Sequence, residues 1–323
     1  MKTQKLLFLL ALLVSFAACG DDDGDIVISK GSGSSSSTTG TDSINSNKNT
    51  SGPKEAKYRL EFPHLQKGVV LVHQAELNKN NKQTGVNYSV EWDTDLQSQR
   101  WSCYQLYSSI NFHSSYNVQR YQADNDGSLS PYCQYPNDPY LSGNYQFTTD
   151  PYKYSGYDHG HICPSADRQR STDCNYQTFF ITNMQPQYNK FNAGLWEKME
   201  EDVRNWVSQS DTLYVCKGGT IDKATNIIEY VHQNSHQSSR VNANHIPVPR
   251  FFFMALLSRK GNQYQAMGYW VQHLNEDHSK DNRKGYAISI DRLEELTGID
   301  FFCNLPDDIE DAVEKAITTS YWF

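Results

Sequence analysis

The stretch that decides the fold is YSGYDHGHICPSADRQRSTDCNYQTFFITNMQPQYNKFNAGLWEKMEEDVRNW, which runs from Tyr154 to Trp206. It brings together a pair of histidines, many asparagines and glutamines, and a helical pattern that carries carboxylates and an arginine. Aromatic residues surround these polar groups. Ionisable and amide side chains gathered beside core-forming residues are typical of a chemical site, so we expect the rest of the chain to support this stretch.

The second half of the stretch has the periodicity of an amphipathic helix. Its apolar face carries Leu195, Met199 and Trp206. A neighbouring face carries residues that recur every four positions: Asn192, Trp196, Glu200 and Arg204. Side chains at this spacing share one side of a helix. With a strand expected at Thr178–Thr182, the pattern predicts a strand, strand, helix site in which the helix faces the loop of His161.

The side chains of this site favour one kind of chemistry. A neutral imidazole, with an ordinary pKa of about 6.5, takes a proton from water near neutral pH. Amide and carboxylate oxygens are hard ligands that suit Mg²⁺ with most of its waters retained. Arginine adds a forked donor that matches phosphate oxygens. A base, a hard metal ion and arginine together indicate hydrolysis of phosphodiester bonds.

The motifs also resemble a known family. DHGH at residues 158–161, TNMQPQ at 182–187 and FNAGLWEKME at 191–200 occur in the order and spacing of the DNA/RNA non-specific endonucleases of the ββα-metal type. This family includes secreted bacterial nucleases and mitochondrial endonuclease G. The similarity runs from about Gly68 to Leu305. It implies an endonuclease that cuts both DNA and RNA, leaves 5′-phosphate ends and in many cases forms a homodimer.

The resemblance implies a role for each matching residue at the reacting centre. His161 would be the general base that activates water. Asn192 would be the one direct protein ligand of Mg²⁺, with Mn²⁺ as an alternative ion. Glu200 would be a catalytic residue that holds metal-bound water.

Further residues would bind substrate or support the base. Asn183 would support the histidine region and count among the substrate-binding residues. Arg204 would contact phosphate, and Arg120, in VQRYQADND, is the best match to a second arginine of the family. His159 stands where the family usually has arginine, so its contact with phosphate and the pH dependence of substrate affinity are open.

Two alternatives compete with the nuclease hypothesis. His159, His161 and Cys163 alternate along the chain, so one strand face would present three ligands to Zn²⁺, as in a zinc hydrolase. The other alternative is a catalytically weak or inactive surface lipoprotein that binds nucleic acid. It is motivated by His159, which stands where the family usually has arginine. The joint presence of His161, Asn192 and Glu200 argues against it.

The N-terminal residues indicate export. Residues 1–18 contain two lysines followed by an apolar run too short to span a bilayer, which is typical of a signal peptide. FAAC at residues 16–19 resembles a lipoprotein cleavage box, so Cys19 would be lipidated and anchor the protein to a membrane. We expect an outer-membrane or cell-surface lipoprotein; a secreted or periplasmic protein is the alternative. Residues 19–54 lack large apolar side chains and are expected to form a disordered tether.

Residues 55–323 are expected to form one endonuclease domain. Predicted strands are Gly68–His73, Asn87–Trp92, Arg100–Tyr107, Thr212–Val215, Pro249–Leu257 and Tyr264–Val271. Predicted helices are Ser289–Leu296, closed by Gly298, and Pro306–Ile317. Strands on either side of a helical centre give an α+β fold with a mixed or antiparallel sheet. The resemblance adds a ββα-metal, or His-Me finger, motif.

Cysteine count and net charge leave other points open. Apart from Cys19, six cysteines remain, an even number that makes disulfides plausible in an exported protein. A Cys163–Cys174 bridge would brace the site, and buried free thiols are the alternative. His232 and His236 have metal-ligand spacing only if helical, and a solvated loop is favoured. The net charge of −8 excludes a broad basic face, so we expect weak, salt-sensitive binding of nucleic acid.

Overall fold

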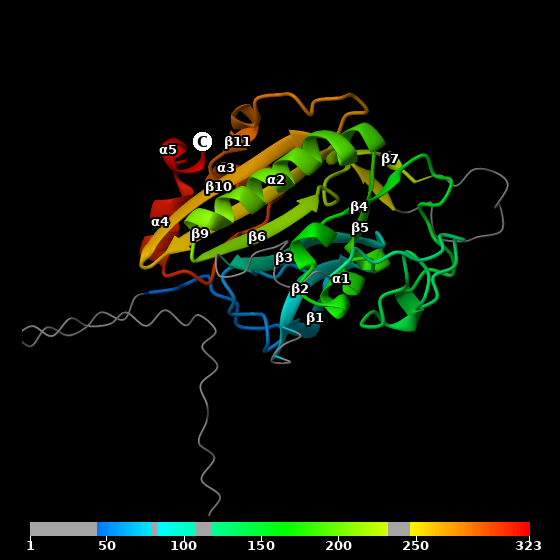
Figure 1. The fold of residues 1–323 in the computed structure, drawn as a ribbon. Coiled ribbons are helices and arrows are strands. Elements are labelled where there is room, and N and C mark those ends of the chain that lie inside the picture. Colours follow the sequence, from blue (N-terminus) through cyan, green and yellow to red (C-terminus); the bar gives the residue numbers. More distant parts are fainter. Residues whose placement is uncertain (1–43, 79–82, 108–117, 232–245) are drawn as a thin grey trace, which may run out of the picture. The chain divides into compact units, whose positions relative to one another are not determined.

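A seven-stranded sheet forms the centre of the structure (Figure 1), with the strand order β1-β2-β3-β6-β9-β10-β11. Every neighbouring pair in this sheet is antiparallel. The strands are β1 Val69–Asn78, β2 Gln83–Asp93, β3 Ser98–Tyr107, β6 Thr212–Gly219, β9 Phe251–Lys260, β10 Gln263–Gln272 and β11 Ala287–Ile288. The predicted α+β class with an antiparallel core is confirmed.

This computed structural model describes residues 44–78, 83–107, 118–231 and 246–323. The predicted signal peptide, Cys19 and residues 19–43 of the predicted tether lie outside the described residues, as do His232 and His236. None of the helices within the described ranges has the length and apolar composition needed to cross a bilayer.

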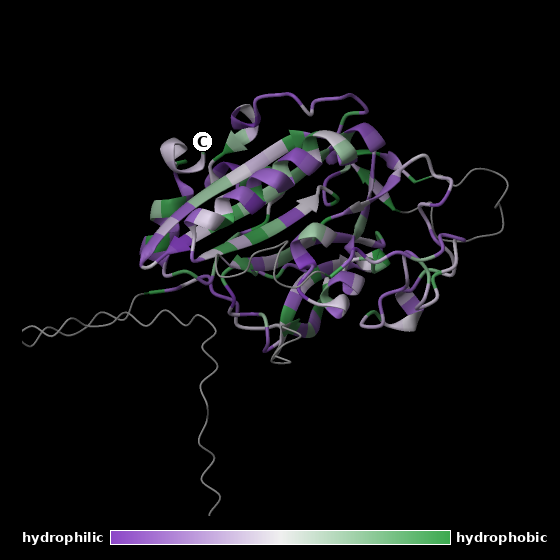
Figure 2. Cartoon of the chain, in the orientation of Figure 1, coloured by the Kyte–Doolittle hydropathy of each residue, from purple (hydrophilic) through white to green (hydrophobic). Residues whose placement is uncertain are grey.

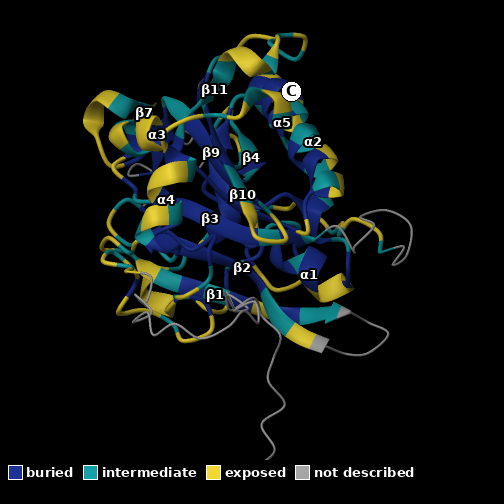
Figure 3. Cartoon of the chain, turned by 90° about the vertical axis from the view of Figure 1, so that its left-hand side faces the viewer, coloured by how far each residue is buried: buried dark blue, intermediate teal, exposed yellow. Residues whose placement is uncertain are grey.

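Alternate residues of the central strands enter two separate cores. On β6, Leu213 and Val215 belong to one core, whereas Tyr214 and Cys216 belong to the other. β9 alternates in the same way along its apolar run. Successive side chains of a strand point to opposite faces, so a continuous apolar strand needs cover on both faces of its sheet. Figure 3 shows these central strands as buried.

α2 (Glu197–Trp206) covers one face of the sheet. Its apolar side packs into the first core, while the side turned away from the sheet is largely hydrophilic (Figure 2). α5 (Thr319–Trp322) enters the same core through Trp322, whose backbone oxygen accepts a hydrogen bond from Trp206 Nε1 at 2.6 Å. The predicted apolar helix face is confirmed, since Leu195, Met199 and Trp206 are all buried.

α3 (Ile290–Thr297) and α4 (Asp307–Glu314) cover the other face. Ser289 caps α3 by accepting a hydrogen bond from the backbone N–H of Arg292, and Gly298 ends it with a φ of 77°. Serine at the start and a left-handed glycine at the end are the preferred helix signals, so these boundaries were readable in advance.

The predicted strand at Thr178–Thr182 is wrong. α1 (Thr172–Gln177) continues into turns, because the backbone N–H groups of residues 178–180 each bond to the carbonyl three residues back. A 3₁₀ turn, Ile181–Asn183, follows, and the strand begins only at β5 (Met184–Gln187). Groups bonded locally are not available for a sheet ladder.

The remaining elements are short. The strands are β4 Asp158–His161, β7 Ile227–Tyr230 and β8 Pro247–Pro249, and β4 pairs with β5 as β7 pairs with β8. The further 3₁₀ turns are Gly143–Tyr145, Ser165–Arg168, Val207–Gln209, Ala224–Asn226 and Arg283–Tyr286. A π-helical turn, Phe191–Trp196, precedes α2.

The ordered structure begins earlier than the expected start of the domain at residue 55. Asn45 Nδ2 donates to the backbone oxygen of Leu305 at 2.6 Å, and the buried Asn49 donates to the backbone oxygen of Pro63 at 3.0 Å. Residues 44–54 therefore pack against the domain and are not part of a tether. The composition rule failed here because the asparagines are held by hydrogen bonds to backbone, not by burial of apolar surface.

A buried arginine joins three parts of the sheet. Arg100 of β3 has a fully buried side chain that pairs with Glu91 and Asp93 of β2. Its Nε also lies 2.9 Å from Asp222 Oδ1, beyond the end of β6. Glu91 in turn accepts the backbone N–H of Gly68 at 2.7 Å, just before β1. Removal of one partner from a buried ion pair leaves an uncompensated charge, which is strongly destabilising.

We predict that Arg100→Met lowers the free energy of unfolding by about 3–5 kcal/mol, because it strands the carboxylates of Glu91 and Asp93. Urea denaturation followed by fluorescence measures the loss. Arg292→Met is the matched control, since Arg292 pairs with Glu295 on the surface and the change should cost at most about 0.5 kcal/mol. Equal losses in the two variants would contradict the prediction.

Candidate active site

A strand pair and a helix hold the two central motifs. β4 carries His159 and His161 and pairs antiparallel with β5, with His161 opposite Met184. The chain then enters the π-helical turn with Asn192 and continues into α2. Gly160 permits close pairing of β4 with β5, since a Cβ there would lie 2.2 Å from the side chain of Gln187. The predicted strand, strand, helix arrangement is present, with its second strand at β5.

One cavity of about 820 Å³ brings most of the predicted site residues together. The predicted residues that line it are Arg120, His159, His161, Asn192, Glu200 and Arg204. They come from the loop after β3, from β4, from the π-helical turn and from α2. Tyr135, Tyr152, Tyr154 and Tyr157 line the cavity too, beside Asp158 and Lys153. Arg120 and Arg204, which are 84 positions apart in the sequence, thus line the same polar cavity.

His161 is held in place by Phe179 and by the backbone of β4. Its ring meets Phe179 edge to face, with centroids 4.8 Å apart. The backbone carbonyl of His159 bonds to the ring, and Nε2 is shielded from solvent and has no hydrogen-bond partner among the described residues. Burial, followed by the charges of Arg120 and His159, lowers the pKa of His161 well below its ordinary value. The imidazole is therefore neutral at neutral pH and can accept a proton.

Asn192 offers an amide oxygen to the cavity. Its Nδ2 donates to Asp158 Oδ2 at 3.0 Å, and Asn189 Nδ2 donates to the same oxygen at 2.9 Å. Because the nitrogen end of the amide is held by Asp158, the oxygen end is the group left for a cation. The π-helical turn bends at Gly194, whose φ and ψ are −121° and −109°, and such turns are frequent at functional sites.

Glu200 is paired with a buried lysine that sequence analysis missed. Lys217 Nζ lies 2.6 Å from Glu200 Oε1, and its side chain is 1 % exposed. The same ammonium lies 4.7 Å from the ring centre of Trp196, which is a core residue as favoured from the sequence. Burial raises the pKa of Glu200, and Lys217 opposes that rise. The sequence contains one sign of this pair, because Lys217 is a lysine within the apolar run of β6.

The cationic and histidine groups at the rim are fixed by other side chains. Arg204 Nη1 donates to Asp167 Oδ1 at 3.0 Å, so its partner is Asp167 and not Glu200. Arg120 lies over the Phe179 ring, 4.9 Å from its centre. His159 Nε2 lies 2.9 Å from both oxygens of Asp150.

Asn183, predicted to bind substrate and to support the histidine region, does not line the cavity. Its side chain is fully buried. Oδ1 accepts from the backbone N–H of Cys163 at 2.9 Å and from Ser102 Oγ at 3.1 Å, while Nδ2 donates to the backbone oxygens of Cys163 and Thr178, both at 2.8 Å. The amide supports the chain just after His161, as its other predicted role requires.

The zinc alternative is not supported by the geometry. Cys163 lies beyond the end of β4, is fully buried and packs in the first core. Among the described residues, a cluster of three acidic side chains has the spacing to hold a metal ion. This cluster lies away from β4, on α3 and α4. The six described cysteines are buried free thiols, so a Cys163–Cys174 bridge is not formed.

Comparisons with known proteins agree with this site. The family model described as DNA/RNA non-specific endonuclease matches residues 69–308. A nuclease of Nostoc sp. is 30% identical over 50% of this chain and 57% of its own length. Mitochondrial endonuclease G of Homo sapiens is 26% identical over 47% of this chain and 50% of its own length. The chain thus spans about half the length of the curated relatives that it matches.

A solved structure has the same fold. A chain in the crystal structure of the EndoG/EndoGI complex superposes with a TM-score of 0.59, 20% sequence identity and coverage of 79% of this chain and 94% of that chain. The family match covers well over half of this chain and includes the motifs of β4, β5 and α2. On this basis the chain belongs to the DNA/RNA non-specific endonuclease family.

Proposed function

We propose that this protein is a metal-dependent endonuclease that hydrolyses phosphodiester bonds of DNA and RNA. One observation carries the proposal: a neutral imidazole shares a cavity with an amide oxygen, a carboxylate and two arginines. Membership of the non-specific endonuclease family supports it. These groups supply the base, the cation ligand and the phosphate contacts that such hydrolysis needs.

The donor set fits a hard divalent cation. Asn192 presents its amide oxygen, because Asp158 holds the nitrogen, and Glu200 adds a carboxylate that can hold a metal-bound water. Oxygen donors with retained waters suit Mg²⁺, or Mn²⁺ as the alternative. When bound, the cation would stabilise negative charge on the phosphate oxygens and on the leaving oxygen.

The residues of the chain perform the remaining steps. The His161 imidazole takes a proton from a water molecule in the cavity, and the resulting hydroxide attacks phosphorus. The guanidinium groups of Arg204 and Arg120 bind the phosphate oxygens and so position the scissile bond. The bond from phosphorus to the 3′ oxygen breaks, the 3′ oxygen takes up a proton from water to become a hydroxyl group, and the phosphate stays on the 5′ oxygen. Lys217 holds Glu200 in place through their short ion pair and opposes the rise that burial causes in the pKa of Glu200.

We predict that His161→Ala lowers cleavage of supercoiled plasmid and of RNA by about 100- to 10,000-fold, because the general base is lost. Asn192→Ala should also abolish most cleavage, and EDTA should stop the wild type. Gel assays with and without Mg²⁺ measure the rates. His64→Ala and Asn262→Ala are matched controls, since both residues are exposed and neither lines the cavity.

Two outcomes would contradict the proposal. Unchanged hydrolysis by His161→Ala would remove the base from the mechanism. Tight binding of nucleic acid by folded wild-type protein, without cleavage in Mg²⁺, would favour the inactive surface binding protein, with His159 in place of arginine as the cause.

The pKa of His161 predicts the acid side of the pH profile. The base works only when neutral, so the rate falls as pH drops through this pKa. Because burial, Arg120 and His159 lower the pKa, the acid limb of kcat/KM should lie below pH 6.5. Arg120→Gln removes one of these charges, so the limb should move to higher pH. Arg292 lies on the exposed side of α3, so Arg292→Gln should leave the pH profile unchanged. An acid limb that does not move in Arg120→Gln would refute the assignment of this limb to His161.

We also propose that the protein is exported and anchored by a lipid on Cys19, as the composition of residues 1–23 supports. The expected result is that labelled palmitate enters the wild type in a bacterial host but not Cys19→Ser, which leaves the membrane fraction. Cys133→Ser serves as the control because Cys133 lies within the domain. Equal labelling of Cys19→Ser would rule the anchor out.

A further inference from the structure

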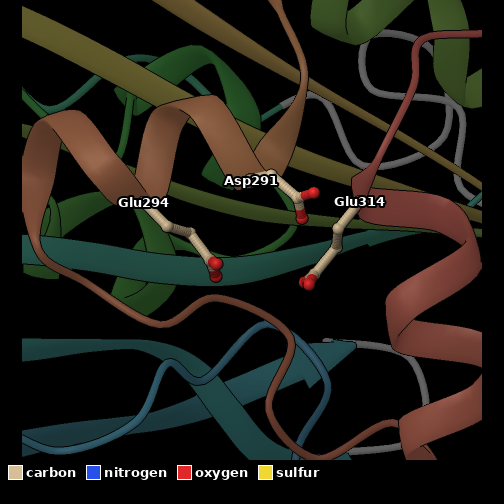
Figure 4. A group of neighbouring side chains, drawn as sticks. All are labelled: Asp291, Glu294 and Glu314. Carbon is tan, nitrogen blue, oxygen red and sulfur yellow. The ribbon is translucent and has the colours of Figure 1, made fainter.

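Three carboxylates converge between two helices on the face of the sheet opposite to α2. Asp291 and Glu294 belong to α3, and Glu314 is the last residue of α4. One oxygen from each side chain lies within 4.8 Å of the others, and Figure 4 shows the three side chains turned toward one another. None of them lines the cavity of the candidate active site.

The charged groups that act on this cluster are nearly all acidic. Glu314 is influenced by Glu294, Glu310, Asp300 and Asp291. His64 is the basic group that acts on Asp300. The neighbouring basic side chains have partners outside the cluster: Arg292 with Glu295, and Lys315 with Asp311.

One oxygen in the cluster lacks any protein partner. Glu314 is 6% exposed, and its Oε1 is shielded from solvent without a hydrogen-bond partner in the described parts of the chain. Glu294 has one donor, the backbone N–H of Phe301 at 2.7 Å from Oε1. A buried carboxylate without a partner is costly, and such groups are normally paired or bound to metal. A cation between the helices would give this oxygen a partner that the described residues do not supply.

We propose that Asp291, Glu294 and Glu314 form a Ca²⁺ site that joins α3 to α4. Ca²⁺ prefers carboxylate oxygens and tolerates irregular geometry. At ligand distances of about 2.4 Å, two oxygens on one Ca²⁺ ion can lie up to about 4.8 Å apart, and the three oxygens of this cluster lie within that limit. Mg²⁺ demands near-ideal octahedral geometry and keeps several of its waters, and Zn²⁺ favours nitrogen and sulfur ligands.

The site serves the fold and does not rest on the proposed nuclease function. α4 leads directly into α5, whose Trp322 packs in the first core behind α2. An ion between α3 and α4 holds this C-terminal segment against the sheet. Its occupancy therefore affects the unfolding temperature more than the chemistry of the cavity.

The test compares full-length wild type with Glu314→Gln after removal of metal ions. At a Ca²⁺ concentration about 100 times the dissociation constant, the unfolding temperature of the wild type should rise by about 5 °C. Glu314→Gln should lose most of this shift. In EDTA it should melt no lower than the wild type, because the substitution relieves repulsion, and its plasmid cleavage should be unchanged.

Asp311→Asn is the matched control, because Asp311 lies on the exposed side of the same helix and loses the same charge. It should keep the full Ca²⁺ shift. Any Ca²⁺ bound in the catalytic cavity contributes equally to all three proteins, so only the part that depends on Glu314 counts. Equal shifts in wild type and Glu314→Gln would overturn the proposal, and an equal Glu314-dependent shift with Mg²⁺ would overturn the choice of ion.

A second variant covers the case in which Glu314→Gln does not fold. Asp291 is exposed, so Asp291→Asn should leave the fold intact. Titration calorimetry should show that Ca²⁺ binds this variant at least about 10-fold more weakly than the wild type at the helix site. Identical binding isotherms would overturn the proposal.

Discussion

The Asn183 side chain is the contact on which the candidate site most depends. Its amide bonds to both backbone groups of Cys163, to the backbone oxygen of Thr178 and to Ser102 of β3. The strand that carries His161 is thereby tied to the end of α1 and to the central sheet. An imidazole acts as a base only when it is held in a fixed direction. A buried amide with every group satisfied gives that rigidity, whereas an apolar residue would leave backbone groups unpaired.

The charges of the cavity are arranged in pairs, which reconciles an acidic protein with a polyanionic substrate. Glu200 is paired with Lys217 and Arg204 with Asp167, and His159 contacts Asp150. The two ion pairs fix side chains without adding net charge to the cavity. Arg120 and Lys153 on the cavity wall, together with a cation at Asn192, would add the positive potential that helps the guanidinium of Arg204 to attract phosphate. Such a local field is short-ranged and sensitive to salt, in contrast to a broad basic face.

Several parts of this fold could be read from the sequence because they depend on local patterns. The apolar face of α2, the caps of α3 and the strand positions follow from periodicity and from single residues such as Ser289 and Gly298. The site residues were found because their motifs lie close together along the chain. Arg120 is the exception, since it was matched on loose spacing and yet lines the cavity.

The features that escaped prediction depend on contacts between distant parts of the chain. Lys217 looked like an isolated charge in a strand, and its importance appears only when β6 lies beside α2. Asn45 and Asn49 looked like tether residues, but Asn45 donates to the backbone oxygen of Leu305 and Asn49 donates to the side-chain sulfur of Cys303. Residues 178–182 have the composition of a strand but form turns, because local hydrogen bonds already pair the backbone N–H groups of residues 178–180. Pattern reasoning sees the propensity of a segment, whereas these outcomes are decided by which partner a polar group meets.

The alternation of the central strands separates chemistry from stability. On β6, Lys217 points into the core beneath α2, whereas its neighbour Cys216 points into the core beneath α3. The sheet therefore carries the catalytic cavity on one face and the carboxylate cluster on the other. The three carboxylates do not line the cavity, so an ion at the cluster makes no direct contact with the residues of the candidate active site. An ion that fastens α3 to α4 can thus stabilise the domain and leave the position of His161 unchanged, which lets the two sites respond to two different cations.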